Sequence, residues 1–281
     1  MARFCGLPHS VTQVSAYVSC HNAAATIRRT VESLLGQTIK PAEVIVVDDG
    51  STDGSIDAMW GLDVRVVTHP SNLGRGEARA RAMREARHEF VLCCDATNTL
   101  EPAFVEKALP WFENQRVAAV FGRITQPHAR NVAERWRGRH LFKLDLVQES
   151  RHGASLCTWG TLMRASAASA VGGYDTRLRH CEDADLGARL LRGGFDVVFD
   201  PLLETISVGS NTPAQVLERY WRWNATGGTL TWYQYLQQVA HSVRVLARKD
   251  LAANDPAAVP ISLAAPHYQA WKTWTQERPR A

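Results

Sequence analysis

Acidic and polar side chains follow the apolar runs of this chain at the points where the runs end. Asp48 and Asp49 follow a β-branched run, Asp95 follows a second, and Ser19 and Asn22 end an earlier one. Such runs are typical of strands buried on both faces of a parallel sheet. The carboxyl ends of parallel strands share one edge, where open α/β sheets bind ligands. The pattern predicts that these side chains converge on a ligand, although acids that only cap the next helix are the alternative.

A further acidic group begins a helix-like segment at residues 182–191. Glu182, Asp183 and Asp185 all lie within residues 182–185. The helix dipole favours carboxylates at this end of a helix, and capping alone accounts for Glu182. Three acids so close together exceed what capping needs. A carboxylate held at a helix start near other acids is suited to act as a general base.

A glycine-bearing turn at residues 72–77 precedes a basic helix-like segment. Arg75 and Arg79 are four residues apart and therefore share one helix face. Glycine turns with arginine beside a helix N-terminus suit a phosphate. The alternative is a solvated basic face, and this is the preferred interpretation for Arg81, Arg84 and Arg87. The turn lacks the full Gly-x-Gly-x-x-Gly pattern of dinucleotide sites.

The elements that must position these residues alternate between strand-like and helix-like patterns. Strands are predicted at residues 12–19, 44–47, 64–68, 90–94, 117–121, 157–163 and 195–199. Helices are predicted at 23–35, 55–60, 78–87, 131–147, from 165, at 182–191, and through the aromatic tail 219–246. This order predicts a Rossmann-like, three-layer α/β/α fold with a mostly parallel sheet and a helical C-terminal extension. The predicted organisation is an N-terminal extension (1–11), one α/β domain (12–210) and a Trp-rich helical extension (211–281).

Composition limits the class of protein. The chain has 281 residues, 45% of them hydrophobic, and a net charge of +4, which permits anionic ligands but does not favour nucleic acid. No apolar run is long enough to span a membrane, and residues 1–10 lack the apolar core of a signal peptide. The six cysteines show no Cys-x-x-Cys pairing, which favours reduced, buried thiols in a cytoplasmic protein and argues against a zinc site.

Aromatic residues are concentrated late in the chain. Five of the nine Trp follow residue 210. The segment 131–147 combines Trp136 with arginines, a pattern that fits either peripheral contact with an anionic membrane surface or a solvent-facing charged stripe. The predicted location is therefore cytoplasmic, with peripheral contact at the inner membrane face as an option.

An ordered set of motifs resembles the family 2 glycosyltransferases, which have the GT-A fold. The match covers about residues 12–205 and consists of the segments 18–22, 46–53, 72–79, 95–97, 172–175 and 182–185. The resemblance implies a nucleotide-sugar donor, with UDP favoured, and an inverting single displacement. It also implies a divalent cation, Mn²⁺ or Mg²⁺, and a saccharide, glycolipid or other hydroxyl acceptor.

The resemblance also assigns roles on the donor side. Ser19, Asp48 and Asp49 match positions that hold the uracil and ribose, with Asn22 beside them. Arg79 matches an arginine near the nucleotide, and Arg75 is a further candidate to lie near the diphosphate. Asp95 matches the first acid of the Asp-X-Asp motif, which meets the ribose and the metal-bound diphosphate.

The catalytic and acceptor roles follow in the same way. Asp183 matches the catalytic base. Trp159, Gly160 and Thr161 fall where family members line the sugar and acceptor pocket, to which Glu182 is added. Arg222 and Trp223 belong to an Arg-x-x-Arg-Trp motif seen in members that act on polysaccharides or glycolipids.

Two positions depart from the family pattern. Thr97 replaces the second acid of Asp-X-Asp, and Ser207 lies near the place where many relatives carry a histidine. A hydroxyl is a poorer ligand for a hard cation than a carboxylate, so cation binding is predicted to be weak unless Asn98, Glu204 or water completes the coordination.

The alternatives are a catalytically silent nucleotide-binding protein and a sugar-phosphate nucleotidyltransferase. The second would need a Gly-rich loop with arginine after the first strand, which residues 21–25 do not provide. The donor sugar, the acceptor and the oligomeric state stay open.

Overall fold

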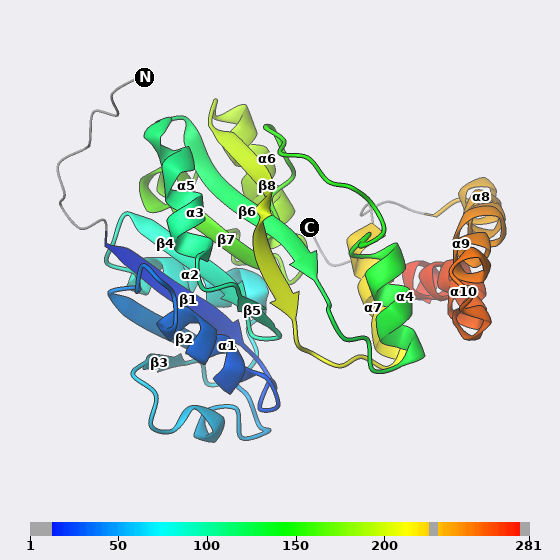
Figure 1. Cartoon of the computed structure of the whole chain (residues 1–281), viewed down its shortest axis with the longest axis horizontal. Coiled ribbons are helices and arrows are strands. Elements are labelled where there is room, and N and C mark those ends of the chain that lie inside the picture. The colour runs from blue at the N-terminus through cyan, green and yellow to red at the C-terminus, as the bar shows by residue number, and fades with distance from the viewer. Residues whose placement is uncertain (1–12, 225–229, 276–281) are drawn as a thin grey trace. The chain divides into compact units, whose positions relative to one another are not determined.

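The computed structural model describes residues 13–224 and 230–275 and divides into two compact units (Figure 1). The first, called the sheet unit, comprises residues up to Ile124 together with Glu149–Val208. The second, called the helical unit, comprises Thr125–Gln148 and the chain from Gly209 onward. The segment 125–148, which the sequence placed inside the α/β domain, thus groups with the C-terminal helices.

The sheet unit is built on one mixed sheet, and the predicted α/β class is confirmed. Within the described residues the sheet has eight strands in the order β3-β2-β1-β4-β7-β6-β8-β5. Their bounds are β1 (Val14–Cys20), β2 (Glu43–Asp48), β3 (Arg65–Thr68), β4 (Phe90–Asp95), β5 (Asn98–Leu100), β6 (Val117–Thr125), β7 (Gly160–Arg164) and β8 (Asp196–Ser207).

The first four strands in the sheet order run parallel, and their register brings the predicted ligand residues to one edge. Ser19 of β1 pairs with Val47 of β2 on one side and with Asp95 of β4 on the other. Asp48 pairs with Cys20 and with Thr68. From β4 onward the sheet changes character, because β7 runs antiparallel to both β4 and β6.

Helices cover both faces of this sheet, as required by β1, in which nearly every residue is buried although successive side chains point to opposite faces. Val14, Ala16 and Val18 pack in a core cluster with α1 and α3, whereas Tyr17 packs on the opposite face with Ala78 of α2. The flanking elements are α1 (Ile27–Leu35), η1 (Asp57–Met59), α2 (Arg75–Glu85), α3 (Phe104–Ala108), η2 (Leu109–Glu113), α5 (Ala165–Ala170) and α6 (Glu182–Arg192).

The helical unit consists of packed helices on the described part of residues 125–148 and 209–275. Its elements are α4 (Val132–His140), α7 (Pro213–Asn224), α8 (Trp232–His241), the π-helical turn η3 (Ser242–Ala247), α9 (Arg248–Ala252), the 3-10 turn η4 (Pro256–Ala258) and α10 (Val259–Thr275). None of the described helices is long and apolar enough to cross a membrane.

The prediction for residues 131–147 is wrong in two respects. The helix ends at His140, because Leu141 and Phe142 both donate their backbone N–H to the carbonyl of Arg137 and Lys143 then adopts φ +53°. The helix also forms neither a membrane-facing nor a solvent-facing stripe, since Trp136 is 0% exposed. The polar partners of this helix lie more than a hundred residues later in the chain, so the local sequence pattern could not indicate them.

Those partners centre on the carboxylate of Asp250 in α9. Asp250 is 0% exposed, pairs with Arg139 and His140 of α4, and accepts the Ser262 hydroxyl of α10. Trp136 in turn donates its indole N–H to Ser262 at 2.8 Å. Burial would raise the pKa of Asp250, but the hydrogen bonds from His140 and Ser262 outweigh it, and the pKa is lowered. This network joins three helices through one buried charge.

The described cysteines are thiols that form no disulfide with one another, but they are not all buried. Cys20, Cys93 and Cys94 are buried as predicted, and Cys157 is half-buried. Cys181 is exposed, so the prediction of buried thiols is wrong there. Cys5 lies outside the described residues.

The turn after β2 depends on a glycine. Gly50 adopts φ +71°, and a Cβ placed on it would lie 2.6 Å from the backbone carbon of Ser71. The loops that follow β2 and β3 therefore touch backbone to backbone. Gly61 has a similar φ of +83° but nothing within 4 Å of its Cβ position.

Replacing these two glycines by alanine separates the energetic cost of a left-handed backbone from the cost of steric overlap. Gly61→Ala meets only the left-handed backbone cost and should destabilise by about 1–2 kcal/mol. Gly50→Ala adds overpacking against backbone and should cost about 3 kcal/mol or more in total. Urea unfolding followed by circular dichroism measures both; equal midpoints for the two variants would show that the loop yields without cost.

Candidate active site

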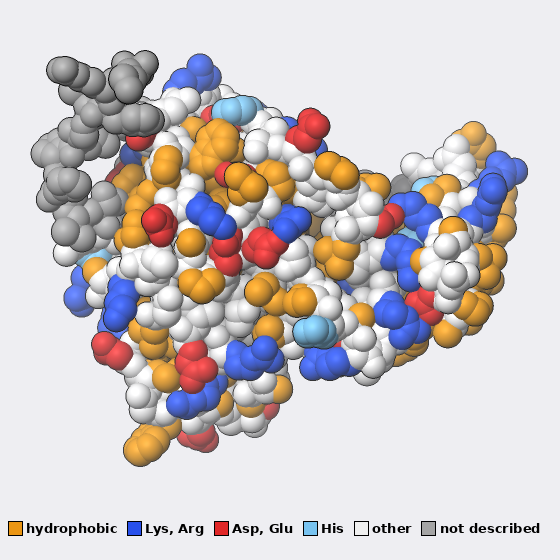
Figure 2. Space-filling model, viewed as in Figure 1, with side chains coloured by type: hydrophobic (Ala, Val, Ile, Leu, Met, Phe, Trp, Pro, Cys, Tyr) orange, Lys and Arg blue, Asp and Glu red, His pale blue; other side chains and the backbone are white. Residues whose placement is uncertain are grey.

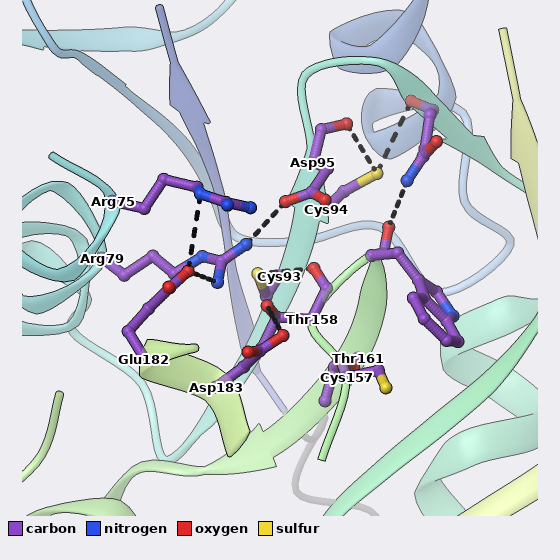
Figure 3. A network of polar contacts seen from close by, with 12 residues as sticks. Arg75, Arg79, Cys93, Cys94, Asp95, Cys157, Thr158, Thr161, Glu182 and Asp183 are labelled. Carbon is purple, nitrogen blue, oxygen red and sulfur yellow. Dashed lines mark hydrogen bonds and ion pairs between the residues drawn. The ribbon is translucent and has the colours of Figure 1, made fainter. Parts of the chain in front are cut away.

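The guanidinium of Arg79 lies at the centre of the polar network on the sheet edge (Figure 3). Arg79 comes from α2, is 1% exposed, and forms ion pairs with Asp95 at the end of β4 and with Glu182 at the start of α6. The Asp95 bond is 2.7 Å long. Burial lowers the pKa of Arg79, but the charges of Asp95 and Glu182 outweigh this and raise it well above its usual value. One cation thus joins three elements.

Asp183 follows Glu182 directly and lies on the same helix start. It is half-buried, and its Oδ2 accepts a hydrogen bond from the Thr158 hydroxyl at 3.3 Å. Its other oxygen accepts the backbone N–H of Ala184. In Figure 3 Asp183 points toward Thr158, on the side of Glu182 away from Arg75. The predicted base is therefore oriented by groups that leave part of its carboxylate accessible.

Buried polar atoms in this network lack partners. The Nε of Arg79 and the Oε2 of Glu182 are both buried with no hydrogen-bond partner among the described residues. Arg75 adds only a longer contact, 3.8 Å from its Nε to Glu182. Burying a polar atom without a hydrogen-bond partner lowers the stability of the fold. Such atoms therefore indicate that this network serves a function rather than stability.

Three side chains that are uncharged at neutral pH, Cys93, Cys157 and Tyr174, lie near this network. Burial raises the pKa of the Cys93 thiol to about 12, and burial also raises the pKa of Cys157 and Tyr174. The Tyr174 hydroxyl lies 3.2 Å from that of Tyr17. These groups stay uncharged at neutral pH, so the carboxylates above them carry the negative charge of the site.

The adjacent acids Asp48 and Asp49 have different surroundings. Asp49 is 4% exposed; its carboxylate accepts the backbone N–H groups of Leu73 and Gly74 and contacts His69 at 2.8 Å. Asp49 therefore shapes the turn before α2. The Oδ2 of Asp48 accepts the Ser51 N–H, but its Oδ1 is buried without a partner. Contact of either acid with a nucleoside stays a prediction.

Ser19 and Asn22 lie close to the acids. Ser19 lies between β2 and β4, next to Asp95 in the register. Asn22 adopts φ +49° and ties the loops together: its Oδ1 accepts the Thr52 N–H at 2.9 Å and its own N–H donates to Ser51. The convergence of the strand ends, predicted from the sequence, is confirmed by these contacts and the register.

The glycine turn at the start of α2 makes close contacts within the chain. The Gly76 N–H donates to the carbonyl of Leu178, and a Cβ on Gly76 would lie 2.4 Å from the carbonyl oxygens of Asp175 and Leu178. The chain itself occupies this part of the helix start, and phosphate binding at the turn stays a prediction. Arg81, Arg84 and Arg87 are 43%, 55% and 73% exposed, as a solvated face requires.

The predicted acceptor pocket residues divide into four groups. Trp159 is half-buried and donates its indole N–H to Gly122, while its carbonyl accepts from Asn98. Gly160 and Thr161 are buried inside the sheet. Glu182 is 1% exposed and holds Arg79, which leaves no surface for an acceptor. Arg222 and Trp223 lie in α7 of the helical unit.

Asp95 offers a divalent cation the carboxylate oxygen that Arg79 does not use. Asp95 is 30% exposed on its side chain and uses one oxygen for Arg79. Glu204 pairs with Arg123, and no group of three His, Cys, Asp or Glu forms a metal site in the described part of the chain. Because Mg²⁺ is commonly held by one or two carboxylates plus substrate phosphates and water, this oxygen set fits a cation that shares its ligands with the donor.

The sequence did not predict the Arg79–Glu182 pair or the Thr158–Asp183 contact. The i, i+4 spacing of Arg75 and Arg79 indicated a shared face, and Arg79 was placed near the nucleotide. Nothing in the spacing showed that a residue 103 positions away would neutralise it.

The mixed sheet covered by helices on both faces, with acids at the ends of β2 and β4, agrees with the GT-A fold predicted from the motifs. The sequence model "Glycosyl transferase family 2" matches residues 15–172 of this chain. The chain therefore belongs to glycosyl transferase family 2. The family and the fold predicted from the motifs are both confirmed.

Similar proteins carry related names. The chain is 30% identical over 201 residues to the pre-mycofactocin glycosyltransferase of Mycobacterium tuberculosis, covering 67% of this chain and 41% of the relative. It is 24% identical over 209 residues to a poly-beta-1,6-N-acetyl-D-glucosamine synthase of Staphylococcus epidermidis, covering 68% and 48%. The chain thus spans less than half the length of these curated relatives.

Solved structures share the fold at lower identity. A mannosyltransferase from Pyrobaculum calidifontis, solved with GDP-Man and Mn²⁺, superposes with a TM-score of 0.58 at 17% identity, covering 95% of this chain and 76% of that one. At this identity the likeness establishes the fold alone.

Breaking the buried ion pair should be far more costly than breaking an exposed one. Arg79→Met leaves Glu182 buried without its cation and should destabilise the chain by about 3–5 kcal/mol. Arg79→Met combined with Glu182→Met removes both charges and should recover much of that loss. The matched control is Arg81→Met, an exposed i, i+4 pair, which should cost at most about 0.5 kcal/mol. Urea unfolding of the four proteins measures these differences; additive losses in the double variant would contradict a direct pairing.

Proposed function

We propose that this chain transfers a sugar from a nucleoside diphosphate sugar to a hydroxyl of a saccharide or lipid-linked acceptor, with inversion. The observation that carries the proposal is the link through Arg79, which fixes the start of α6, with Asp183, against the edge that bears Asp95. Donor binding and proton removal need their groups in a fixed relation, and this link supplies it.

On the donor side, the proposal assigns Ser19 and Asp48 to the nucleoside and Asp95 to the diphosphate end. The unpartnered Oδ1 of Asp48 supports this, because a buried acceptor without a donor suits a ligand hydroxyl or N–H. Asp49 supports the same edge indirectly, since its carboxylate builds the adjacent turn. The relatives named above are consistent with a nucleotide-sugar donor, and a uridine nucleotide is the proposed form.

A divalent cation held by Asp95 would stabilise charge on the leaving diphosphate. Thr97 contributes at most a hydroxyl to it. Arg79 does not take this role directly, because it is 1% exposed and already bound to two carboxylates.

On the acceptor side, Asp183 is proposed as the general base. The acceptor hydroxyl gives its proton to the Asp183 carboxylate while its oxygen forms a bond to the anomeric carbon. The bond from that carbon to the diphosphate breaks, and the nucleoside diphosphate leaves with the electron pair. Attack from the face opposite the leaving group inverts the configuration without an enzyme nucleophile. The accessible Asp183 carboxylate, oriented by Thr158, supports this assignment.

A panel of nucleotide sugars tests the function, with Asp183→Asn as the decisive variant. The wild-type chain should turn over at least one donor. Asp183→Asn should lower that rate by about 10²–10⁴-fold, because no group takes the acceptor proton. Calorimetric titration with the matching nucleoside diphosphate should give an unchanged affinity. The control is Asp185→Asn, two residues along the same helix and paired with Arg189, which should keep most activity. Nucleotide binding without turnover of any donor would identify a silent binding protein instead.

Cation dependence gives a second test. Because Asp95 is the single acid of the motif, we expect turnover to need more Mn²⁺ or Mg²⁺ than a site with two carboxylates, or to respond little to chelator. Thr97→Asp adds a carboxylate and should lower the half-saturating cation concentration severalfold. Titrating chelated enzyme with each cation measures it. A wild-type enzyme that is saturated by micromolar metal, with no gain in the variant, would contradict the proposed role of Thr97.

A further inference from the structure

Helix α8 of the helical unit (Trp232–His241) has no buried residue. Its large side chains face outward: Trp232 is 69% exposed, Tyr233 71% and Leu236 60%. Trp274 of α10 is 46% exposed and packs against Trp232 with the two rings tilted at 49° and their centroids 4.9 Å apart. Exposed apolar surface that is contiguous, rather than scattered, marks an interaction site.

The exposed side continues along η3 and α9. Val243, Arg244, Arg248 and Leu251 are exposed, whereas Ser242, Leu246, Ala247 and Asp250 are buried on the opposite side. The buried positions, 242, 246, 247 and 250, recur at the spacing of one helix face, so the exposed residues between them lie on the other side. We call the set Trp232, Tyr233, Leu236, Val243, Arg244 and Arg248 the outer face.

Charge is distributed unequally between the two units. The described residues of the helical unit contain eleven Lys and Arg but five Asp and Glu, whereas those of the sheet unit contain eighteen and twenty-two. Figure 2 shows basic and hydrophobic side chains prevailing over acidic ones on the lobe that Figure 1 labels α8–α10.

The acids of the helical unit cannot neutralise the outer face. Each of the five described acids already has a basic partner: Glu134 with Arg130, Asp145 with Lys249, Glu218 with Lys272, Asp250 with Arg139, and Asp255 with Arg135. Arg244 and Arg248 are exposed, and neither forms an ion pair with any described residue. Their charges are therefore available to an anionic partner.

We propose that the outer face binds the surface of a bilayer that contains anionic lipids. Trp and Tyr rings favour the headgroup level of a membrane, and a helix with aromatic residues and arginines on one side lies in that plane. The arginines four residues apart would meet lipid phosphates, while Trp232 and Leu236 enter the apolar boundary. A second copy of the chain is disfavoured, because it would bring the same arginines together. A neutral glycan would leave the arginines unused.

Vesicle sedimentation tests this with the full chain and does not depend on turnover. The chain should bind vesicles that contain phosphatidylglycerol, and bind weakly to pure phosphatidylcholine. Arg244→Gln and Arg248→Gln should each weaken binding to the anionic vesicles by about fivefold, and high salt should weaken it further. Trp232→Ser should weaken binding by about tenfold or more, because its apolar surface no longer leaves water.

Matched controls come from the sheet unit. Trp60 is 86% exposed, and Arg29 is exposed without an ion pair to a described residue, so Trp60→Ser and Arg29→Gln should leave binding unchanged. Unaltered circular dichroism spectra establish that the variants fold. The proposal is overturned if anionic vesicles do not bind, if the control variants lose as much binding, or if the outer-face variants change only self-association in ultracentrifugation or retention on a polysaccharide gel.

Discussion

The burial of Arg79 is the constraint on which the site depends. A guanidinium that is 1% exposed must be surrounded by carboxylates, and removing either partner leaves an uncompensated charge. The two partners, Asp95 and Glu182, come from the end of a strand and the start of a helix. The position of α6, and with it Asp183, is therefore tied to the edge of the sheet by electrostatics. Gly76 contributes in a different way, because its missing side chain leaves room for the segment that leads into α6.

Patterns within one element predicted much of the fold and of the site. β-Branched runs ending in acids identified the parallel strands, and parallel register alone brings Ser19 beside Asp95. Pairings between distant elements could not be predicted in this way. Glu182 looked like a capping acid, and the helix 131–147 looked like a surface, because the sequence does not show which carboxylate meets which arginine. Trp136 is buried because its indole N–H donates to Ser262, which in turn donates to the buried Asp250, and the local sequence does not indicate either contact.

The adjacent acids at the end of β2, Asp48 and Asp49, differ in role: one stabilises the local structure and the other is available to a ligand. Both Asp48 and Asp49 are buried, so solvent exposure does not distinguish them. Their hydrogen bonds do: Asp49 accepts from two backbone amides of the following turn, whereas Asp48 keeps one oxygen without a donor. A carboxylate whose oxygens are occupied by the backbone is a fixed part of the scaffold. One with an unpaired buried oxygen gains most from a ligand, so Asp48 is the stronger candidate for direct contact.

The unequal charge of the two units bears on the class of acceptor. A transferase that meets a dissolved saccharide gains nothing from a basic, aromatic outer face such as that of α8–α9. An acceptor anchored in lipid is different, since an enzyme held at the same surface encounters it at a raised effective concentration without any new contact. This advantage requires only that both molecules share the membrane surface, and it does not depend on how the two units are arranged. If the outer face binds anionic bilayers, a lipid-linked acceptor is favoured over a soluble one. The enzyme would then select its acceptor partly through its location at the membrane surface, to which the helical unit binds it.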